Sequence, residues 1–254
     1  MILIHRFTPF FILCSAASGF AAVVVSALPV LPGLALTVAM VAFLFARLCR
    51  LSPRSFQFWY LTGTPVTFLL SSFGFLLLLE RPLERWALAA ATSLLLFLFA
   101  ELVFAYVHVP ATYRAYSIEH LSLGLNVLTT FFLSSFAFGT GMLLQLPLWL
   151  SSAAFASSVA FIMFGTLWVS KVAVRPALAY ALAGTALATE LFAVISYLPT
   201  GYYVDAALIS VFLYVFLGLT RARFLDKMTK TVVGRYSAVG SGLFLLLMGT
   251  ARWT

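Results

Sequence analysis

The feature that most constrains this chain is a succession of apolar segments, each about 20 residues long, from one end to the other. A helix of about 20 mostly apolar residues crosses the hydrocarbon core of a bilayer and satisfies its own backbone polar groups there. Only 9% of the 254 residues are charged, whereas a soluble globular domain carries about 25%. The sequence therefore predicts an all-α, polytopic integral membrane helical bundle, with residues 1–254 forming a single transmembrane domain.

Eight segments are long enough to span a membrane, and a shorter ninth lies near the C-terminus. Tryptophans lie at segment ends and prolines lie in most of the connections, as expected at the boundaries of spans. The ninth segment is expected to be a short tilted span, a re-entrant helix or an interfacial helix. The spans are predicted at 9–28, 31–49, 59–79, 86–107, 121–144, 148–170, 177–198 and 204–220, followed by the short segment 237–251.

Basic residues gather in alternate linkers, on the side of the N-terminus. The formal net charge is +8, which in a soluble protein would suggest a nucleic-acid partner. Here the positive-inside rule accounts for the charge, so we expect no nucleic acid and a cytoplasmic N-terminus. The basic residues of that side are Arg6, Arg47, Arg50, Arg54, Arg114, Lys171, Arg175, Arg221, Arg223, Lys227, Lys230 and Arg235.

The last of these linkers carries five basic residues among apolar ones. Such a segment can lie on the inner leaflet, where anionic lipid attracts each basic group by about 1 kcal/mol. The same charges also serve as the topology signal, so both interpretations stay open. The bilayer is the expected partner, with anionic lipid at this segment, and a protein partner or a homo-oligomer is left open. The five residues are Arg221, Arg223, Lys227, Lys230 and Arg235.

Two parts of the chain resemble each other. Glu101 precedes Pro110 by nine residues, and the same spacing separates Glu190 from Pro199. The offset covers three helices, so equivalent helices would cross in opposite directions, as in the inverted repeats of secondary transporters. Helices built from Leu, Ala and Phe also resemble one another by chance, and this explanation is equally good. The halves of the hypothetical repeat are residues 59–146 and 148–220.

Glu101 and Glu190 are the acidic residues that fall inside the segments. An ionised carboxylate in hydrocarbon costs about 2.5–3.5 kcal/mol on insertion scales. Each must therefore be protonated, paired or in contact with water, and no Lys or Arg lies deep in a segment to pair with it. Proton or cation binding is one interpretation. A hydrogen bond that merely holds neighbouring helices together is the other.

Four further polar residues are candidates for accessory roles. Helical periodicity places Ser93 and His108 on roughly the same face as Glu101, and Tyr197 on the stripe that contains Glu190. Asn126 lies early in the fifth segment and is expected to hydrogen-bond to another helix.

Motifs for cofactors, metals or soluble-type catalysis are absent from the sequence. His108, Glu119 and His120 flank one loop, but their spacing fits no metal-ligand motif, so no metal is expected. The chain has no Walker A loop, dinucleotide fingerprint or hydrolase signature. We expect no cofactor and name no catalytic residue.

The stretch from Glu190 to Ala206, ELFAVISYLPTGYYVDA, resembles a family of uncharacterised bacterial multi-pass membrane proteins, classed as a domain of unknown function. The resemblance covers chiefly the last two or three spans. It implies a location in the bacterial inner membrane. It brings no catalytic residues, because that family has no established activity.

Three functions are compatible with these observations. The first is a secondary carrier or channel-like protein for an ion or small solute, with Glu101 and Glu190 as proton or cation sites. The second is a membrane scaffold or assembly subunit that acts through helix–helix contacts. The third, an enzyme acting on a lipid-linked substrate, would need Glu101, His108, Glu119 or His120 to converge on one cleft, and is the least favoured.

Overall fold

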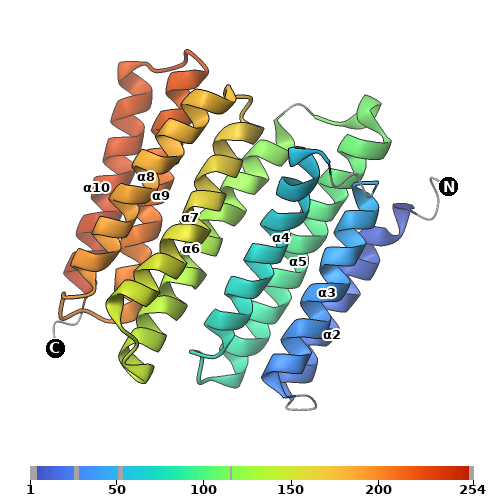
Figure 1. Ribbon diagram of the computed structural model, residues 1–254, viewed down its shortest axis with the longest axis horizontal. Helices are drawn as coiled ribbons and strands as arrows, with labels where there is room; N and C mark the ends of the chain where they lie inside the picture. The colour runs from blue at the N-terminus through green and yellow to red at the C-terminus, as the bar shows by residue number, and fades with distance from the viewer. Residues whose placement is uncertain (1–4, 26–28, 51–53, 115, 252–254) are drawn as a thin grey trace. The chain divides into compact units, whose positions relative to one another are not determined.

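A computed structural model of the chain (Figure 1) describes residues 5–25, 29–50, 54–114 and 116–251. Nine α-helices and one short 3-10 helix account for most of these residues, and no strand occurs among them. The all-α bundle expected from the sequence is confirmed. The elements are α2 (Thr8–Val24), α3 (Val30–Leu48), α4 (Phe56–Leu76), α5 (Pro82–His108), η1 (Pro110–Thr112), α6 (Ser117–Leu144), α7 (Leu148–Val169), α8 (Val174–Ile195), α9 (Tyr202–Phe224) and α10 (Lys230–Thr250).

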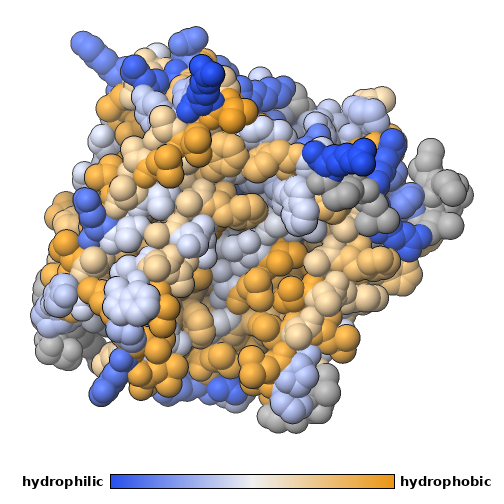
Figure 2. All heavy atoms as spheres, in the orientation of Figure 1, coloured by the Kyte–Doolittle hydropathy of each residue, from blue (hydrophilic) through white to orange (hydrophobic). Residues whose placement is uncertain are grey.

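Seven helices in the described part of the chain, α3 and α5 to α10, are long and apolar enough to cross a membrane. The α2 helix is apolar but has only 17 residues. The α4 helix has 21 residues and carries several Thr and Ser residues, with Pro65 in its interior. Figure 2 shows many apolar residues across this face, with most of the strongly hydrophilic ones near its edges. The chain is a multi-pass membrane protein.

The ninth helix is longer than the sequence suggested. Residues 237–250 of the expected short segment, 237–251, belong to α10, which begins at Lys230 and has 21 residues. Thr229 caps the helix, because its side chain accepts a hydrogen bond from the Val232 amide. Basic residues lower the hydropathy of the first turns of α10, so hydropathy alone did not predict that these turns belong to the helix.

The chain divides into two compact units within α6: unit 1 is Met1–Leu125 and unit 2 is Asn126–Thr254. In unit 1, α2 packs against α5 and α3, and α3 packs against α4. Stacked rings of Phe20 and Phe73, 4.1 Å apart, contribute to this core. The repeat proposed for 59–146 and 148–220 stays a prediction.

In unit 2, α7 packs against α8, and α9 packs against both α8 and α10. Phe192 of α8 lies between two other rings, with centroid distances of 4.3 Å to Phe138 and 4.6 Å to Phe155. Small residues on the buried face of α8 allow its neighbours to approach closely. They are Ala177, Ala181, Gly184 and Ala188.

Candidate functional site

Glu101 lies inside unit 1, on α5, and is half-buried. The one ion pair in the described part of the chain lies elsewhere, between Arg81 and Glu84 in the exposed first turn of α5, at 3.8 Å. Glu101 is thus a carboxyl group without a salt bridge, within a helix that is apolar enough to span a bilayer.

A cluster of histidine, arginine and aromatic side chains lies at the end of α5, two helical turns beyond Glu101. The ring of His108 stacks on Phe104 at 5.2 Å and lies 4.7 Å from the ring of His5, which precedes α2. The guanidinium carbon of Arg6 lies 5.5 Å from the centre of the Phe104 ring. We call these four residues the histidine cluster.

The imidazoles of this cluster have unused hydrogen-bonding capacity. The Nδ1 atom of His5 and both ring nitrogens of His108 are buried, and none makes a well-formed hydrogen bond within the described residues. The His108 imidazole also interacts with the backbone of Phe104. Arg50 adds a further positive charge here, because its Nη2 donates to the Val107 carbonyl at 3.2 Å.

Unit 1 also contains buried hydroxyl groups on α5. Ser93 is only 2% exposed and Thr92 only 1%, and neither hydroxyl has a partner among the described residues. The hydroxyl of Thr64, on the adjacent α4, is also buried without a partner. Buried polar groups that lack protein partners commonly bind ordered water. The α5 helix thus carries polar groups from Thr92 to His108 with capacity for water or a ligand.

Glu190 differs from Glu101 because it lies on the exposed face of α8. Ala183 and Ala186 are exposed on the same stripe, and Val194, one turn on, is 63% exposed. Tyr197 lies just beyond the helix and is 80% exposed. The sequence placed Glu190 within a span, but it could not show which way the helix turns this carboxyl.

Asn126 makes the interhelical hydrogen bond that the sequence predicted. It is 2% exposed, and its Nδ2 donates to the Thr166 hydroxyl of α7 at 2.7 Å. This contact ties α6 to α7 inside unit 2, and it has a structural role.

Glu119 and His120 do not join His108 in a metal site. Glu119 accepts a hydrogen bond from the Tyr113 hydroxyl at 3.2 Å, whereas His120 is exposed. The described residues contain no group of three His, Cys, Asp or Glu side chains that could hold a metal ion. Burial raises the pKa of Tyr113, the Ile118 amide that donates to its hydroxyl opposes this increase, and the nearby Glu119 carboxyl adds to it.

Cys49 follows α3 directly and is buried. Burial raises the pKa of its thiol from 9.0 to about 11, and a hydrogen bond with Thr62 only partly opposes this increase. The thiol is therefore protonated at neutral pH, as expected of an inert structural cysteine.

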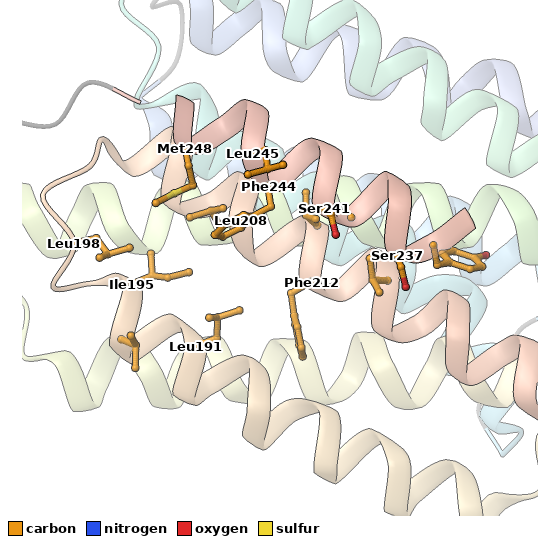
Figure 3. A pocket seen from close by; sticks show the side chains of 15 residues that line it. Leu191, Ile195, Leu198, Leu208, Phe212, Ser237, Ser241, Phe244, Leu245 and Met248 are labelled. Atoms are coloured by element: carbon orange, nitrogen blue, oxygen red, sulfur yellow. The ribbon is translucent and has the colours of Figure 1, made fainter. Parts of the chain in front are cut away.

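A groove that the sequence did not predict lies in unit 2. Side chains of α8, α9 and α10 line it, it is almost entirely apolar, and its volume is about 740 Å³ (Figure 3). The five basic residues of segment 221–235 lie at the turn between α9 and α10, with Arg221 half-buried and the others exposed. No sequence signal marks the groove, because its lining residues are ordinary apolar positions of three separate helices.

Comparison with protein-family models, with curated proteins and with solved structures finds no match to this chain. The resemblance of residues 190–206 to an uncharacterised bacterial family stays a prediction.

Proposed function

We propose that this chain is a carrier or channel-like protein that moves protons or another small cation through unit 1. One observation carries the proposal: among the described residues, α5 combines a carboxyl without a salt bridge, Glu101, with buried hydroxyls and imidazoles that have free hydrogen-bonding capacity. Intramembrane carboxyl and imidazole groups that exchange protons line the pathways of many pumps and transporters.

The assignment of roles follows from position along α5. Glu101 is the group that binds and releases the ion. Thr92 and Ser93 hold water on one side of it, and His108 with His5 relays protons on the other. Two helical turns separate Glu101 from His108, and each turn rises about 5.4 Å along the helix axis. Water must therefore bridge the interval between these two side chains.

The proposal includes a location. The basic linkers favour a cytoplasmic N-terminus, and the resemblance of residues 190–206 implies the inner membrane of a bacterium. In this orientation the histidine cluster lies at the cytoplasmic end of α5, and Ser93 lies nearer the outer surface.

Flux measurements in proteoliposomes test this function. The purified chain is reconstituted with a pH-sensitive dye inside, a potassium gradient with valinomycin sets the membrane potential, and proton entry is recorded. We expect flux well above that of empty liposomes, reduced at least about tenfold by Glu101→Gln, because an amide cannot bind and release the proton. Glu84→Gln, which removes an exposed carboxyl of the same helix, serves as the matched control and should leave flux unchanged.

Two results would contradict the proposal. One is wild-type flux no greater than that of empty liposomes, tested for protons, sodium and potassium in turn. The other is a Glu101→Gln variant with full flux, since this would place the pathway elsewhere.

A second candidate function rests on Glu190. An exposed carboxyl on a membrane helix is costly in lipid, and a partner helix that supplies a hydrogen-bond donor would remove that cost. The exposed Ala183 and Ala186 would let such a helix approach closely. This arrangement supports an assembly subunit, and native electrophoresis of mildly solubilised membranes tests it. We expect a larger species that Glu190→Leu disrupts; a wild-type chain that migrates as a monomer refutes the assembly role.

A further inference from the structure

We propose that residues 5–7, the turn that precedes α2, form a pH-released cover over His108. This N-terminal turn lies against the end of α5 when the imidazoles of His5 and His108 are neutral, and it leaves α5 when they are protonated. The structural change does not depend on the carrier function. Its role as a gate for the pathway along α5 rests on that proposed function.

The N-terminal turn shields His108. The ring of His5 lies 4.7 Å from the ring of His108, and the guanidinium carbon of Arg6 lies 5.5 Å from the centre of the Phe104 ring, on which His108 stacks. Both ring nitrogens of His108 are inaccessible to solvent, although this residue is the last of its helix. The turn therefore contributes to keeping water away from His108.

The turn is joined to α2 less firmly than one helical turn is joined to the next. Pro9 has no N–H group to donate to the carbonyl of His5, four residues earlier. Phe7, which lies between the two, is 55% exposed. Packing holds α2 itself from its first residue, because Thr8, Pro9 and Ile12 are buried. The turn can therefore move while α2 stays in place.

Positive groups surround His108. The N-terminal turn contributes His5 and Arg6, and the end of α3 contributes Arg47 and Arg50. The charges of His5 and Arg50 both act on the His108 imidazole. The other elements that pack against α5 are α2, α4 and η1, and they contain no charged residue within their bounds.

Carboxylates do not offset this charge. Glu101 lies two turns away on α5, and Glu119 accepts a hydrogen bond from the Tyr113 hydroxyl at 3.2 Å. Tyr106, whose ring lies 5.2 Å from that of Tyr113, is uncharged at neutral pH. None of the three arginines near His108 forms an ion pair with a carboxylate of the described residues.

Protonation therefore favours release of the turn. Two neutral aromatic rings in contact attract each other, and histidine is the side chain whose charge changes between about pH 5 and 8. When both imidazoles are protonated, two like charges lie in contact beside Arg6 and Arg50, partly removed from water. Release moves His5 and Arg6 into water. The released form binds more protons than the covered form, so a fall in pH shifts the equilibrium toward release.

Release would act as a gate in the proposed carrier. His108 is the pathway residue at the end of α5 that the turn covers. When the turn leaves, water reaches the His108 imidazole directly, and protons can pass between solvent and the pathway. Acid on the side of the N-terminus would thus open this end of the pathway.

Distances between spin labels test the release in the intact chain. With Cys14 and Cys49 replaced by serine, one label is attached at Phe7→Cys and the other at Leu94→Cys, an exposed position of α5. We expect one narrow distance at pH 7.5. At pH 5.5 a longer distance should appear, with a population at least about fivefold greater than at pH 7.5. The pair Phe11→Cys and Leu94→Cys reports on the exposed face of α2 and should not change.

Histidine variants identify the groups that respond to pH. His5→Phe and His108→Phe each keep an aromatic ring that cannot be protonated, so each should keep the narrow distance at both pH values. His120→Phe is the matched control at an exposed histidine and should retain the pH response. His108→Lys, which is charged at both pH values, should show the longer distance already at pH 7.5. Circular dichroism verifies that each variant is folded.

Several outcomes would overturn the inference. Equal distances at pH 7.5 and 5.5 in the labelled chain would exclude release. A pH response that persists in both His5→Phe and His108→Phe, or that is lost in His120→Phe, would assign it to other groups. A Phe11 label that moves together with the Phe7 label would show that the whole of α2 responds.

The carrier function is tested separately, because the distance measurement requires no transport. A chain that releases the turn but shows no flux would retain the pH-dependent cover and refute the carrier. Flux in a chain whose turn does not move would retain the carrier and refute the cover.

Discussion

Replacing Gly184 with alanine tests how closely the helices of unit 2 approach one another. Gly184 lies on the buried face of α8. A Cβ atom added there would be 2.4 Å from Cε1 of Phe216 on α9 and 2.6 Å from the sulfur of Met163 on α7. Non-bonded carbon atoms normally lie about 3.5–4.0 Å apart. The Phe216 ring must therefore retreat by more than about 1 Å, and the Met163 side chain must also move.

Two opposing effects set the magnitude. Overpacking of a well-filled interior costs about 1–3 kcal/mol. The change from glycine to alanine in a helix contributes about 1 kcal/mol of stability. Gly242 of α10 provides a matched control, because it is also helical but has no atom within 4 Å of an added Cβ. Both substitutions share the propensity effect, so Gly184→Ala should be about 1–3 kcal/mol less stable than Gly242→Ala.

Reversible unfolding in mixed micelles measures the free energy of unfolding of both variants. The fraction of sodium dodecyl sulfate is raised, and helicity is followed by circular dichroism. Equal stabilities of the two variants, within about 0.5 kcal/mol, would refute the reasoning, because they would show that α7, α8 and α9 are not in tight contact at Gly184. A further check uses Phe216→Leu as background. There the penalty of Gly184→Ala should shrink, since the ring that it would strike is gone.

Two other predictions concern polar and reactive groups. A double-mutant cycle of Asn126→Ala and Thr166→Val in the same unfolding assay should give a coupling energy of about 0.6 kcal/mol, and at most about 1.7 kcal/mol. These are the values for other hydrogen bonds between membrane helices. A coupling energy indistinguishable from zero would mean that the contact does not stabilise unit 2. In a Cys14→Ser background, Cys49 should react with a maleimide about 100-fold more slowly at pH 8 than an unperturbed thiol. The reason is that a pKa raised from 9.0 to about 11 lowers the fraction of reactive thiolate at this pH by about 100-fold. The rate should rise with pH toward 11, and the chain unfolded in detergent should lose the protection; equal rates for the folded and unfolded chains would show that Cys49 is not buried.

Fold class and the approximate position of every helix followed from the sequence, for a local reason. Whether a segment contains enough consecutive apolar residues to cross the hydrocarbon core depends on its local sequence alone. Each expected segment corresponds to a helix, and α10 was underestimated because its first turns carry Lys230 and Arg235. The interhelical role of Asn126 was also predictable, since a buried amide in a membrane helix needs a partner.

Only the tertiary structure decides which side of each helix is buried and which is exposed. In a membrane protein the core-facing and lipid-facing residues are both apolar, so hydrophobic periodicity does not separate the two sides of a helix. For this reason Glu101 and Glu190, with the same local context, differ in the structure, one half-buried and the other exposed. The contact of His5 with His108 and the groove of unit 2 likewise join residues from separate helices. Such sites depend on which helices pack together, and that choice is made by side-chain shape across the interfaces, which no single segment contains.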